Sequence, residues 1–304
     1  MSEKDIRTVK DFCCDMTTIL STSRLLFQST SIVTVLVEGK TDWIFFNHYY
    51  DVNKVRFIYA KGKEKIKEIY TTYCNSMIIN QRYIYFCVDI DWDIVLKLEL
   101  KKDFIYNVYH PDTIKPHFND LEIFLINNIN LRKLLNSFEL MDIDQSWLLN
   151  ILECTSRSIG KFRVADQMLR IKYGKEYKSN QLLSNLEMGK ISKYLNQNTW
   201  VINEDLLKIE MKKEFQPEYW DYFLQYADTL NGEWIDGWVL SRGHDVTDIF
   251  LLFLKNKCDK GLNLNREGLE KQIQLVSESK CLLKTFLHYV LLQDGYHPII
   301  TQTS

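Results

Sequence analysis

Three carboxylates follow apolar runs of strand length, and they are the clearest candidates for chemistry in this chain. Glu38 comes directly after residues 31–37, Asp89 directly after residues 83–88, and Asp91 two positions later. Carboxylates that lie close together repel one another and raise one another's pKa unless a cation neutralises them. A hard ion such as Mg²⁺ takes oxygen ligands of this kind. The three residues are therefore candidate ligands of Mg²⁺ or Mn²⁺.

A parallel β-sheet would bring these carboxylates together. Both apolar runs are rich in aliphatic and aromatic residues, which is typical of strands buried on both faces. Ligands of open parallel sheets bind beyond the carboxyl ends of the strands. Two neighbouring strands would thus place Glu38, Asp89 and Asp91 at one crevice. On an extended strand, residues two apart point to the same face at a spacing of about 6.6 Å, so Asp89 and Asp91 are expected to face the same metal centre.

Helix and strand patterns alternate through the first 130 residues. A helix is expected over residues 5–27. Strands are then expected over residues 31–37, 54–60, 83–88 and 104–109, and helices over residues 41–50 and 62–77. Right-handed crossovers place such strands side by side. Asn119 or Asp120 is the expected N-cap of a helix that begins at Leu121. The fold class predicted for this half is α/β, with a parallel four-stranded sheet flanked by helices.

The second half carries few strand signals and is predicted to be a mostly α-helical domain. The expected parts are a helix within residues 1–30 that packs on the core, an α/β domain over residues 31–130, and a helical domain over residues 131–304. The expected helices of the second half are residues 131–140, 146–153, 162–173, 179–195, 217–229, 246–257 and 267–292.

Three short motifs resemble one known family. VEGKTD at residues 37–42, VDIDWD at residues 88–93 and NDLEIFL at residues 119–125 are similar to the TOPRIM domain of topoisomerases, primases and OLD-type nucleases. The motifs look most like the TOPRIM variant of prokaryotic defence proteins, above all the toxic effector subunits of PARIS anti-phage systems. The resemblance implies a Rossmann-like fold with Glu38, Asp89 and Asp91 on the motif positions, and it places Glu122 at the rim of the metal crevice.

The resemblance implies a nuclease that depends on Mg²⁺ or Mn²⁺. Bound metal would orient a scissile phosphate and activate water, and Glu38 could shuttle a proton. The implied setting is abortive anti-phage defence, with tRNA preferred over DNA as the substrate. The implied partners are a restraining AAA- or ABC-type ATPase and a second copy of the chain after release. The alternatives are an OLD-like DNase and a non-catalytic metal-binding module that docks on a partner ATPase.

Several polar residues within and beyond these motifs have open roles. Lys40 either contacts the transferring phosphate or is an ordinary surface lysine. Asp93 is either a metal ligand or a helix cap. A nucleotide-binding P-loop is disfavoured because Thr34 stands where that motif needs a glycine. The neighbours His244 and Asp245 are a candidate accessory pair, although a lone histidine is more often structural. The lesser candidates in a loop near the crevice are His110 and His117.

One stretch of the helical half is strongly basic, although the whole chain carries a net charge of −2. Nucleic-acid contact must therefore come from a local patch. Residues 157–178 carry seven Lys or Arg against Asp166 and Glu176, with Tyr173 and Tyr177 available for stacking. The candidate nucleic-acid contacts are Arg157, Lys161, Arg163, Arg170 and Lys172.

Composition narrows the class of protein further. A chain of 304 residues with 46% hydrophobic content can bury one large core or two smaller ones. The seven cysteines form no C-x-x-C pair, so neither a zinc site nor a disulfide framework is indicated. No apolar run approaches the ~20 residues that span a bilayer, and the first residues lack a signal-peptide core. We expect a cytoplasmic protein with no membrane partner.

Overall fold

The chain forms two compact units. The computed structural model describes residues 15–75, 82–109, 118–233, 238–258 and 261–299. Unit 1 comprises Met1–Asp89, Leu100–His110 and Leu282–Ser304, and unit 2 comprises Ile90–Glu99 and Pro111–Cys281. The chain therefore leaves unit 1 twice and returns to it for its last helix.

Unit 1 is built on a four-stranded parallel sheet with the order β2-β1-β3-β4. Val35 at the centre of β1 is in register with Phe57 on one side and Tyr85 on the other. All residues of β1 and β3 are buried, as expected for central strands covered on both faces. The predicted α/β class is thereby confirmed. The strands are β1 (Val33–Val37), β2 (Val55–Tyr59), β3 (Ile84–Val88) and β4 (Phe104–Tyr106).

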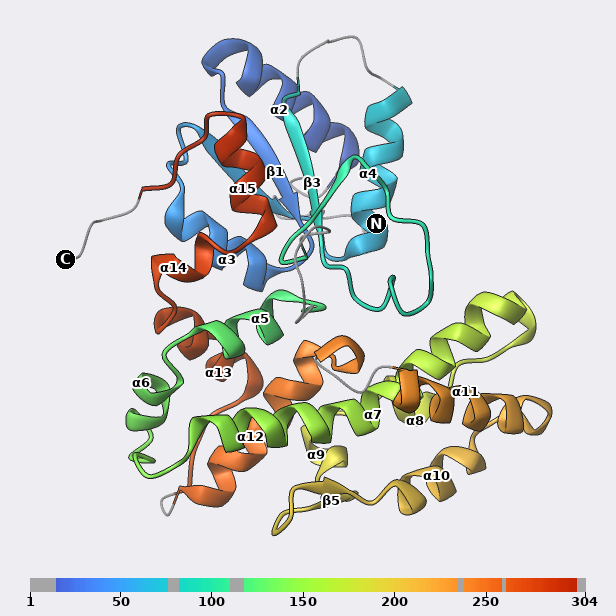
Figure 1. Ribbon diagram of the computed structural model, residues 1–304. Helices are drawn as coiled ribbons and strands as arrows, with labels where there is room; N and C mark the ends of the chain where they lie inside the picture. The colour runs from blue at the N-terminus through green and yellow to red at the C-terminus, as the bar shows by residue number, and fades with distance from the viewer. Residues whose placement is uncertain (1–14, 76–81, 110–117, 234–237, 259–260, 300–304) are drawn as a thin grey trace, which may run out of the picture. The chain divides into compact units, whose positions relative to one another are not determined.

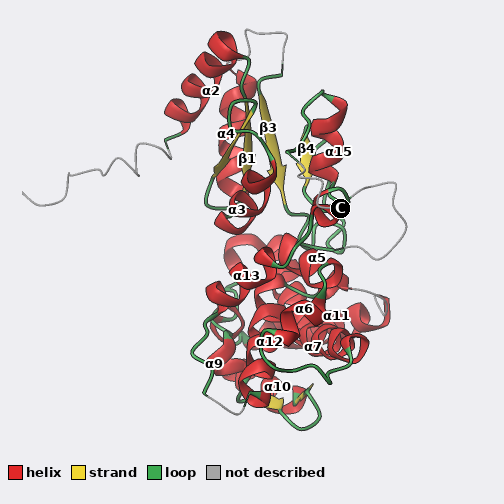
Figure 2. Ribbon diagram, turned by 90° about the vertical axis from the view of Figure 1, so that its left-hand side faces the viewer, coloured by secondary structure: helices red, strands yellow, loops and turns green. Residues whose placement is uncertain are grey.

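The helices of unit 1 cover this sheet. Helix α2 begins at Met16, and Asp15 caps it by accepting a hydrogen bond from the Thr18 N–H. Helices α2 and α4 pack against β1 and β3, and α15 packs beside β4 (Figures 1 and 2). The helices of unit 1 are α2 (Met16–Thr30), α3 (Lys40–Tyr49), α4 (Lys63–Asn75) and α15 (Phe286–Gln293).

Unit 2 is arranged around the long helix α7 (Gln145–Tyr173) (Figure 1). The prediction of two helices separated by a break over residues 154–161 is wrong. Gly160 lies inside that stretch, where a Cβ atom would come within 1.8 Å of the Leu240 carbonyl oxygen. Glycine weakens a helix locally, which lowers the sequence signal, but here it allows the 3₁₀ turn Trp238–Leu240 to approach the helix.

The predicted helices over residues 179–195 and 267–292 are each interrupted. Buried Asn180 caps a single turn, and a two-stranded hairpin lies soon after it. Thr285 starts a new helix by accepting a hydrogen bond from the His288 N–H. The remaining elements are α5 (Leu121–Asn128), α6 (Leu131–Asn136), α8 (Gln181–Ser184), α9 (Met188–Ile191), β5 (Leu195–Asn196), β6 (Val201–Ile202), α10 (Glu204–Lys213), α11 (Trp220–Glu233), α12 (Gly243–Lys257), α13 (Arg266–Leu275) and α14 (Ser279–Leu282).

The boundaries between the two units differ from the predicted domain boundaries. Residues 90–99 and 118–130 belong to unit 2, whereas α15 belongs to unit 1. Helix α15 buries Leu287 and Leu291 completely, and the Phe286 N–H donates to the Asn107 carbonyl just past β4. Helical periodicity identifies the apolar face of such a helix but not the surface that covers it.

The described helices include none with both the length and the apolar composition needed to cross a membrane.

Candidate functional site

The carboxyl edge of the sheet in unit 1 brings Glu38 and Asp89 together. Strands β1 and β3 are parallel neighbours, so the residues just past their ends emerge at the same edge. The Asp89 N–H donates a hydrogen bond of 2.9 Å to Glu38 Oε1. Both residues are half-buried. This is the convergence that the strand-end pattern predicts for these two residues.

Asn107 donates hydrogen bonds to two carboxylates at this edge. It lies just past β4 and is 1% exposed. Its Nδ2 donates to Asp42 Oδ1 at 3.0 Å and more weakly to Asp89 Oδ1 at 3.4 Å. The other oxygen of Asp42 accepts the Gly39 N–H at 2.9 Å, which holds the start of α3. One buried amide thus orients carboxyl groups from α3 and β3.

The carboxyl edge of the sheet is acidic, and a lysine binds the backbone of Asp89 there. Burial raises the pKa of the Cys87 thiol well above its usual value, and the carboxylates of Asp42, Asp89 and Glu38 raise it further. Lys63, the first residue of α4, donates from Nζ to the Asp89 carbonyl oxygen at 2.7 Å. Sequence reasoning missed Asn107 and Lys63. Asn107 was missed because the expected strand covered residues 104–109, whereas β4 ends at Tyr106 and leaves Asn107 just past the strand end.

The structure contradicts the predicted placement of Asp91. Strand β3 ends at Val88, and Asp91 has a φ of 49°, in the left-handed region. Its N–H donates to the Asn119 carbonyl oxygen in unit 2. Asp89 and Asp91 therefore do not lie on one extended strand with their side chains on the same face. Ile90 next to this turn is buried, and Val95 and Leu96 pack into a core cluster of unit 2.

The remaining predicted residues of this group fall in different units. Asp91, Asp93 and Glu122 belong to unit 2, whereas Glu38, Lys40 and Asp89 belong to unit 1. Lys40 is exposed at the start of α3. Asp93 lies in a run of turns, and residues 94–100 form no helix for it to cap. The lesser candidates His110 and His117 lie outside the described residues.

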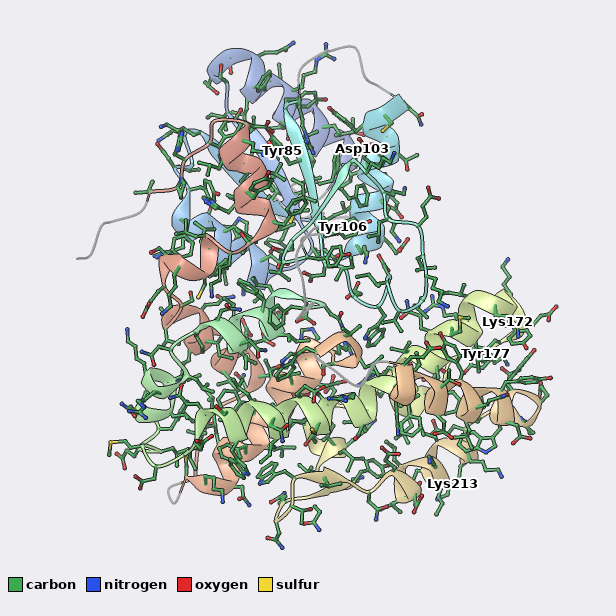
Figure 3. All side chains as sticks on the ribbon, in the orientation of Figure 1. Tyr85, Asp103, Tyr106, Lys172, Tyr177 and Lys213 are labelled. Carbon is green, nitrogen blue, oxygen red and sulfur yellow. The ribbon has the colours of Figure 1, made fainter. Side chains whose placement is uncertain are left out.

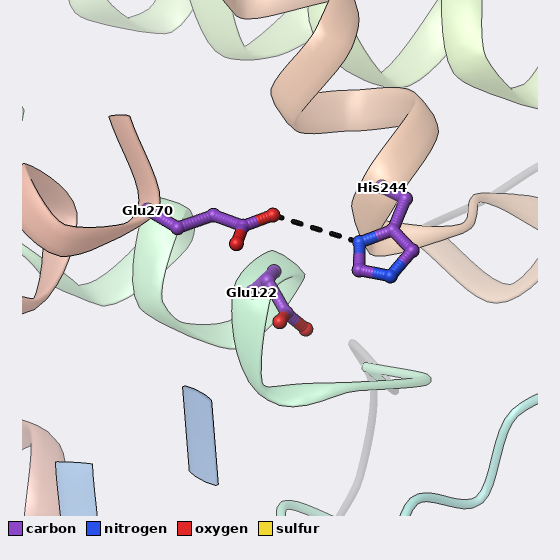
Figure 4. Close-up of side chains that lie close together, drawn as sticks. All are labelled: Glu122, His244 and Glu270. Carbon is purple, nitrogen blue, oxygen red and sulfur yellow. Dashed lines mark ion pairs between the residues drawn. The ribbon is translucent and has the colours of Figure 1, made fainter. Parts of the chain in front are cut away.

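A second polar cluster lies within unit 2 and contains Glu122, His244 and Glu270 (Figure 4). One ligand atom from each side chain lies within 4.8 Å of the others. His244 Nδ1 is 3.5 Å from Glu270 Oε1. Nothing in the sequence singled out Glu270, because the three residues lie on three helices that are far apart along the chain.

Asp120 ties together the two helices that carry Glu122 and His244. It caps α5 by accepting the Ile123 N–H on Oδ1 at 3.0 Å, and it accepts the Gly243 N–H on Oδ2 at 2.6 Å. The expected N-cap of this helix is thereby confirmed. Burial raises the pKa of Asp120 to about 7, and the nearby Glu122 carboxylate adds to the shift. A Cβ atom at Gly243 would lie 2.5 Å from Asp120 Oδ1, so the contact requires glycine there.

His244 and Asp245 do not form the predicted accessory pair. Asp245 is 1% exposed and pairs with Arg163 through two hydrogen bonds of 2.8 Å, from Nε to Oδ2 and from Nη2 to Oδ1. Arg163 Nη2 also donates to the Leu186 carbonyl at 2.9 Å, and Nη1 donates to the Leu183 carbonyl. The prediction that Arg163 contacts nucleic acid is wrong, because its guanidinium is enclosed in unit 2.

Much of the predicted basic patch is likewise engaged inside unit 2. Residues 159–166 of α7 are all buried, and Lys161, 3% exposed, donates from Nζ to Glu204 at 2.7 Å. Arg157 is paired with Glu153 on the same helix. Tyr177 is buried and donates to Asp166 at 2.6 Å, so it offers no stacking surface (Figure 3).

The exposed remainder of the basic patch is at the end of α7. Arg170 and Lys172 are exposed there, and Lys172 Nζ lies 5.1 Å from the centre of the Tyr173 ring (Figure 3). Lys175 and Lys178 come next along the chain and are exposed as well. A sequence run of cations therefore separates, once folded, into buried ion pairs and a smaller surface group.

Comparisons with known proteins identify no family: no protein-family model matches the chain, and no curated protein matches it.

Proposed function

We propose that the sheet edge of unit 1 is the metal centre of a phosphodiesterase that cleaves RNA, with tRNA preferred over DNA. The observation that carries this proposal is the hydrogen bond from the Asp89 N–H to Glu38 Oε1. It puts two carboxylates from neighbouring strands at one edge, where open parallel sheets bind their ligands. Similarity of the three motifs to TOPRIM nucleases supports the same chemistry.

The residues at this edge fit a hard divalent ion. Glu38, Asp89 and Asp42 supply carboxylate oxygens, and Asn107 Oδ1 is a buried oxygen without a hydrogen-bond partner among the described residues. An all-oxygen set is typical of Mg²⁺ and Mn²⁺. Glu38 and Asp89 would hold the ion. When bound, such an ion neutralises a scissile phosphate and lowers the pKa of a water molecule.

The other side chains position these two carboxylates. Asn107 donates to Asp42 and Asp89, which offsets the repulsion between neighbouring negative charges. Lys63 fixes the peptide of Asp89. Lys40, exposed two residues past Glu38, provides a positive charge for the substrate phosphate. A centre held in this way by its neighbours loses little freedom when substrate binds.

The biological setting rests on the motifs alone. Similarity to PARIS effectors supports a toxic role in abortive anti-phage defence, restraint by an AAA- or ABC-type ATPase, and a homodimer once released. Similarity to OLD-type enzymes supports DNA as the alternative substrate. A metal-binding module without catalysis is the alternative from a different class.

Cleavage by purified protein tests the proposal. The full chain with Mg²⁺ is incubated with tRNA and with duplex plasmid DNA, beside Glu38→Ala and the control Glu64→Ala. Glu64 is an exposed carboxylate of unit 1 in an ion pair with Lys67. We expect tRNA cleavage by wild type and Glu64→Ala, and none by Glu38→Ala. Cleavage of the plasmid alone would favour the OLD-like DNase, and equal cleavage by Glu38→Ala would refute the assigned centre.

A further inference from the structure

Three packed helices of unit 2 direct one side chain each at a common point. Glu122 lies in the first turn of α5, His244 in the first turn of α12, and Glu270 on α13 (Figure 4). Each of these helices packs against the other two. Because Asp120 also binds α5 to the start of α12, the positions of Glu122 and His244 are coupled. The three groups are therefore held by rigid elements rather than by loops.

His244 carries a buried ring nitrogen whose contact with Glu270 is longer than a normal hydrogen bond. Nδ1 is shielded from solvent and has no hydrogen bond among the described residues, since Glu270 Oε1 at 3.5 Å is beyond normal N–H···O length. A buried polar atom without a hydrogen bond of normal length is costly unless something binds it. The imidazole as a whole is 42% exposed, so an ion from solvent can reach the cluster.

The spacing of the three groups suits one small cation. Zinc–nitrogen and zinc–oxygen bonds are about 2.0–2.2 Å long, so two ligands of one tetrahedral ion are about 3.4 Å apart. The ligand atoms of the cluster lie within 4.8 Å of one another. Side-chain rotations that shorten these separations by up to about 1.4 Å would complete the site.

Neighbouring groups hold the Glu270 side chain, which is 11% exposed. Thr247 Oγ1 lies 3.5 Å and Arg266 Nε 3.8 Å from Glu270 Oε1. Arg266 is also paired with the buried Asp248 at 3.4 Å, so its charge is shared between two carboxylates. The Glu270 side chain remains oriented toward His244 (Figure 4). Outer contacts of this kind fix the orientation of metal ligands.

We propose that Glu122, His244 and Glu270 bind a divalent transition-metal ion of the zinc class. One imidazole with two carboxylates suits Zn²⁺ or Mn²⁺, whereas Mg²⁺ and Ca²⁺ take oxygen ligands. Three protein ligands leave a coordination position open to solvent or to a substrate, as in catalytic rather than structural zinc sites. This site is separate in ligand chemistry from the all-oxygen edge of unit 1 and does not depend on the function proposed for that edge.

Zinc binding to the full chain tests the site. The protein is stripped with a chelator, dialysed and titrated with Zn²⁺ in a calorimeter, and bound zinc is counted after gel filtration. His244→Ala and Glu270→Gln should each lose one equivalent of bound zinc or lower the affinity for zinc. The loss of affinity should exceed the roughly 10- to 100-fold that follows when a group outside the ligand set is removed. Glu270→Gln is nearly isosteric and can still accept a hydrogen bond from Thr247. Loss of zinc binding in this variant therefore tests the site even if His244→Ala misfolds.

Two control variants separate this site from other zinc ligands. His48→Ala removes an exposed histidine of unit 1, and Glu38→Ala removes a carboxylate of the sheet edge. Both should keep the equivalent of zinc that His244→Ala loses. Wild-type protein that binds no zinc, or His244→Ala that binds as tightly as wild type, would overturn the site. Zinc binding lost in Glu38→Ala alone would place the ion at the sheet edge instead.

Discussion

Replacement of Arg163 by alanine should destabilise unit 2 strongly, although the residue belongs to a basic stretch typical of a nucleic-acid surface. Arg163 makes two hydrogen bonds to Asp245, which is 1% exposed, and one to each of the Leu183 and Leu186 carbonyls. Arg163→Ala leaves the Asp245 carboxylate buried without its partner. Breaking a buried pair in this way costs about 3–5 kcal/mol of unfolding free energy.

This loss is large enough to measure directly. For a unit of this size each kcal/mol lowers the melting temperature by about 2–4 °C, so Arg163→Ala should melt roughly 6–20 °C below wild type. Arg170→Ala is the matched control, because Arg170 is an exposed arginine on the same helix. Its change in stability should stay within about 0.5 kcal/mol. Melting is followed by calorimetry and by urea unfolding.

A double variant identifies the cause of the loss. Asp245→Ala combined with Arg163→Ala removes the charge that the single variant leaves unpaired. The double variant should therefore lose less stability than the sum of the two single variants, by about 0.5–3 kcal/mol. If Arg163→Ala melts like Arg170→Ala and weakens tRNA binding, the guanidinium is a surface contact and the reasoning fails.

Three further predictions concern packing, pH and substrate. Gly160→Ala should lower the free energy of unfolding by about 1–3 kcal/mol, because its Cβ would meet the Leu240 carbonyl oxygen at 1.8 Å. Gly189→Ala is the control and should not destabilise the protein, since a Cβ there would have nothing within 4 Å. Equal urea midpoints for the two variants would contradict this prediction. Burial lowers the pKa of His288, with a contribution from His297, so the unfolded chain binds more protons and the free energy of unfolding should fall as the pH falls through about 6.5. Urea titrations should show a smaller fall in His288→Gln, and an unchanged pH profile would rule out this residue as the source. Arg170→Ala with Lys172→Ala should weaken tRNA binding and flatten its dependence on salt without a change in melting temperature, and an unaltered salt slope would remove this surface from the substrate path.

The sequence alone determined the sheet of unit 1 and its edge. Runs such as residues 83–88 are apolar enough to be buried on both faces, so their strand character depends little on context. Chain direction then places the residues just past each parallel strand at the same edge. Glu38 and Asp89 could be paired for this reason, and Asp120 could be expected as a helix cap from the local pattern of NDLEIFL.

Tertiary structure decided which charged residues are buried and which helices pack together. Arg163 and Arg170 are similar in sequence context, yet one is enclosed with Asp245 and the other is exposed. Glu270 joins His244 because α13 packs against α12. Such contacts join residues far apart along the chain, and local periodicity carries no information about them. A cation is stable inside a protein when a distant carboxylate meets it there, and the fold alone supplies that partner.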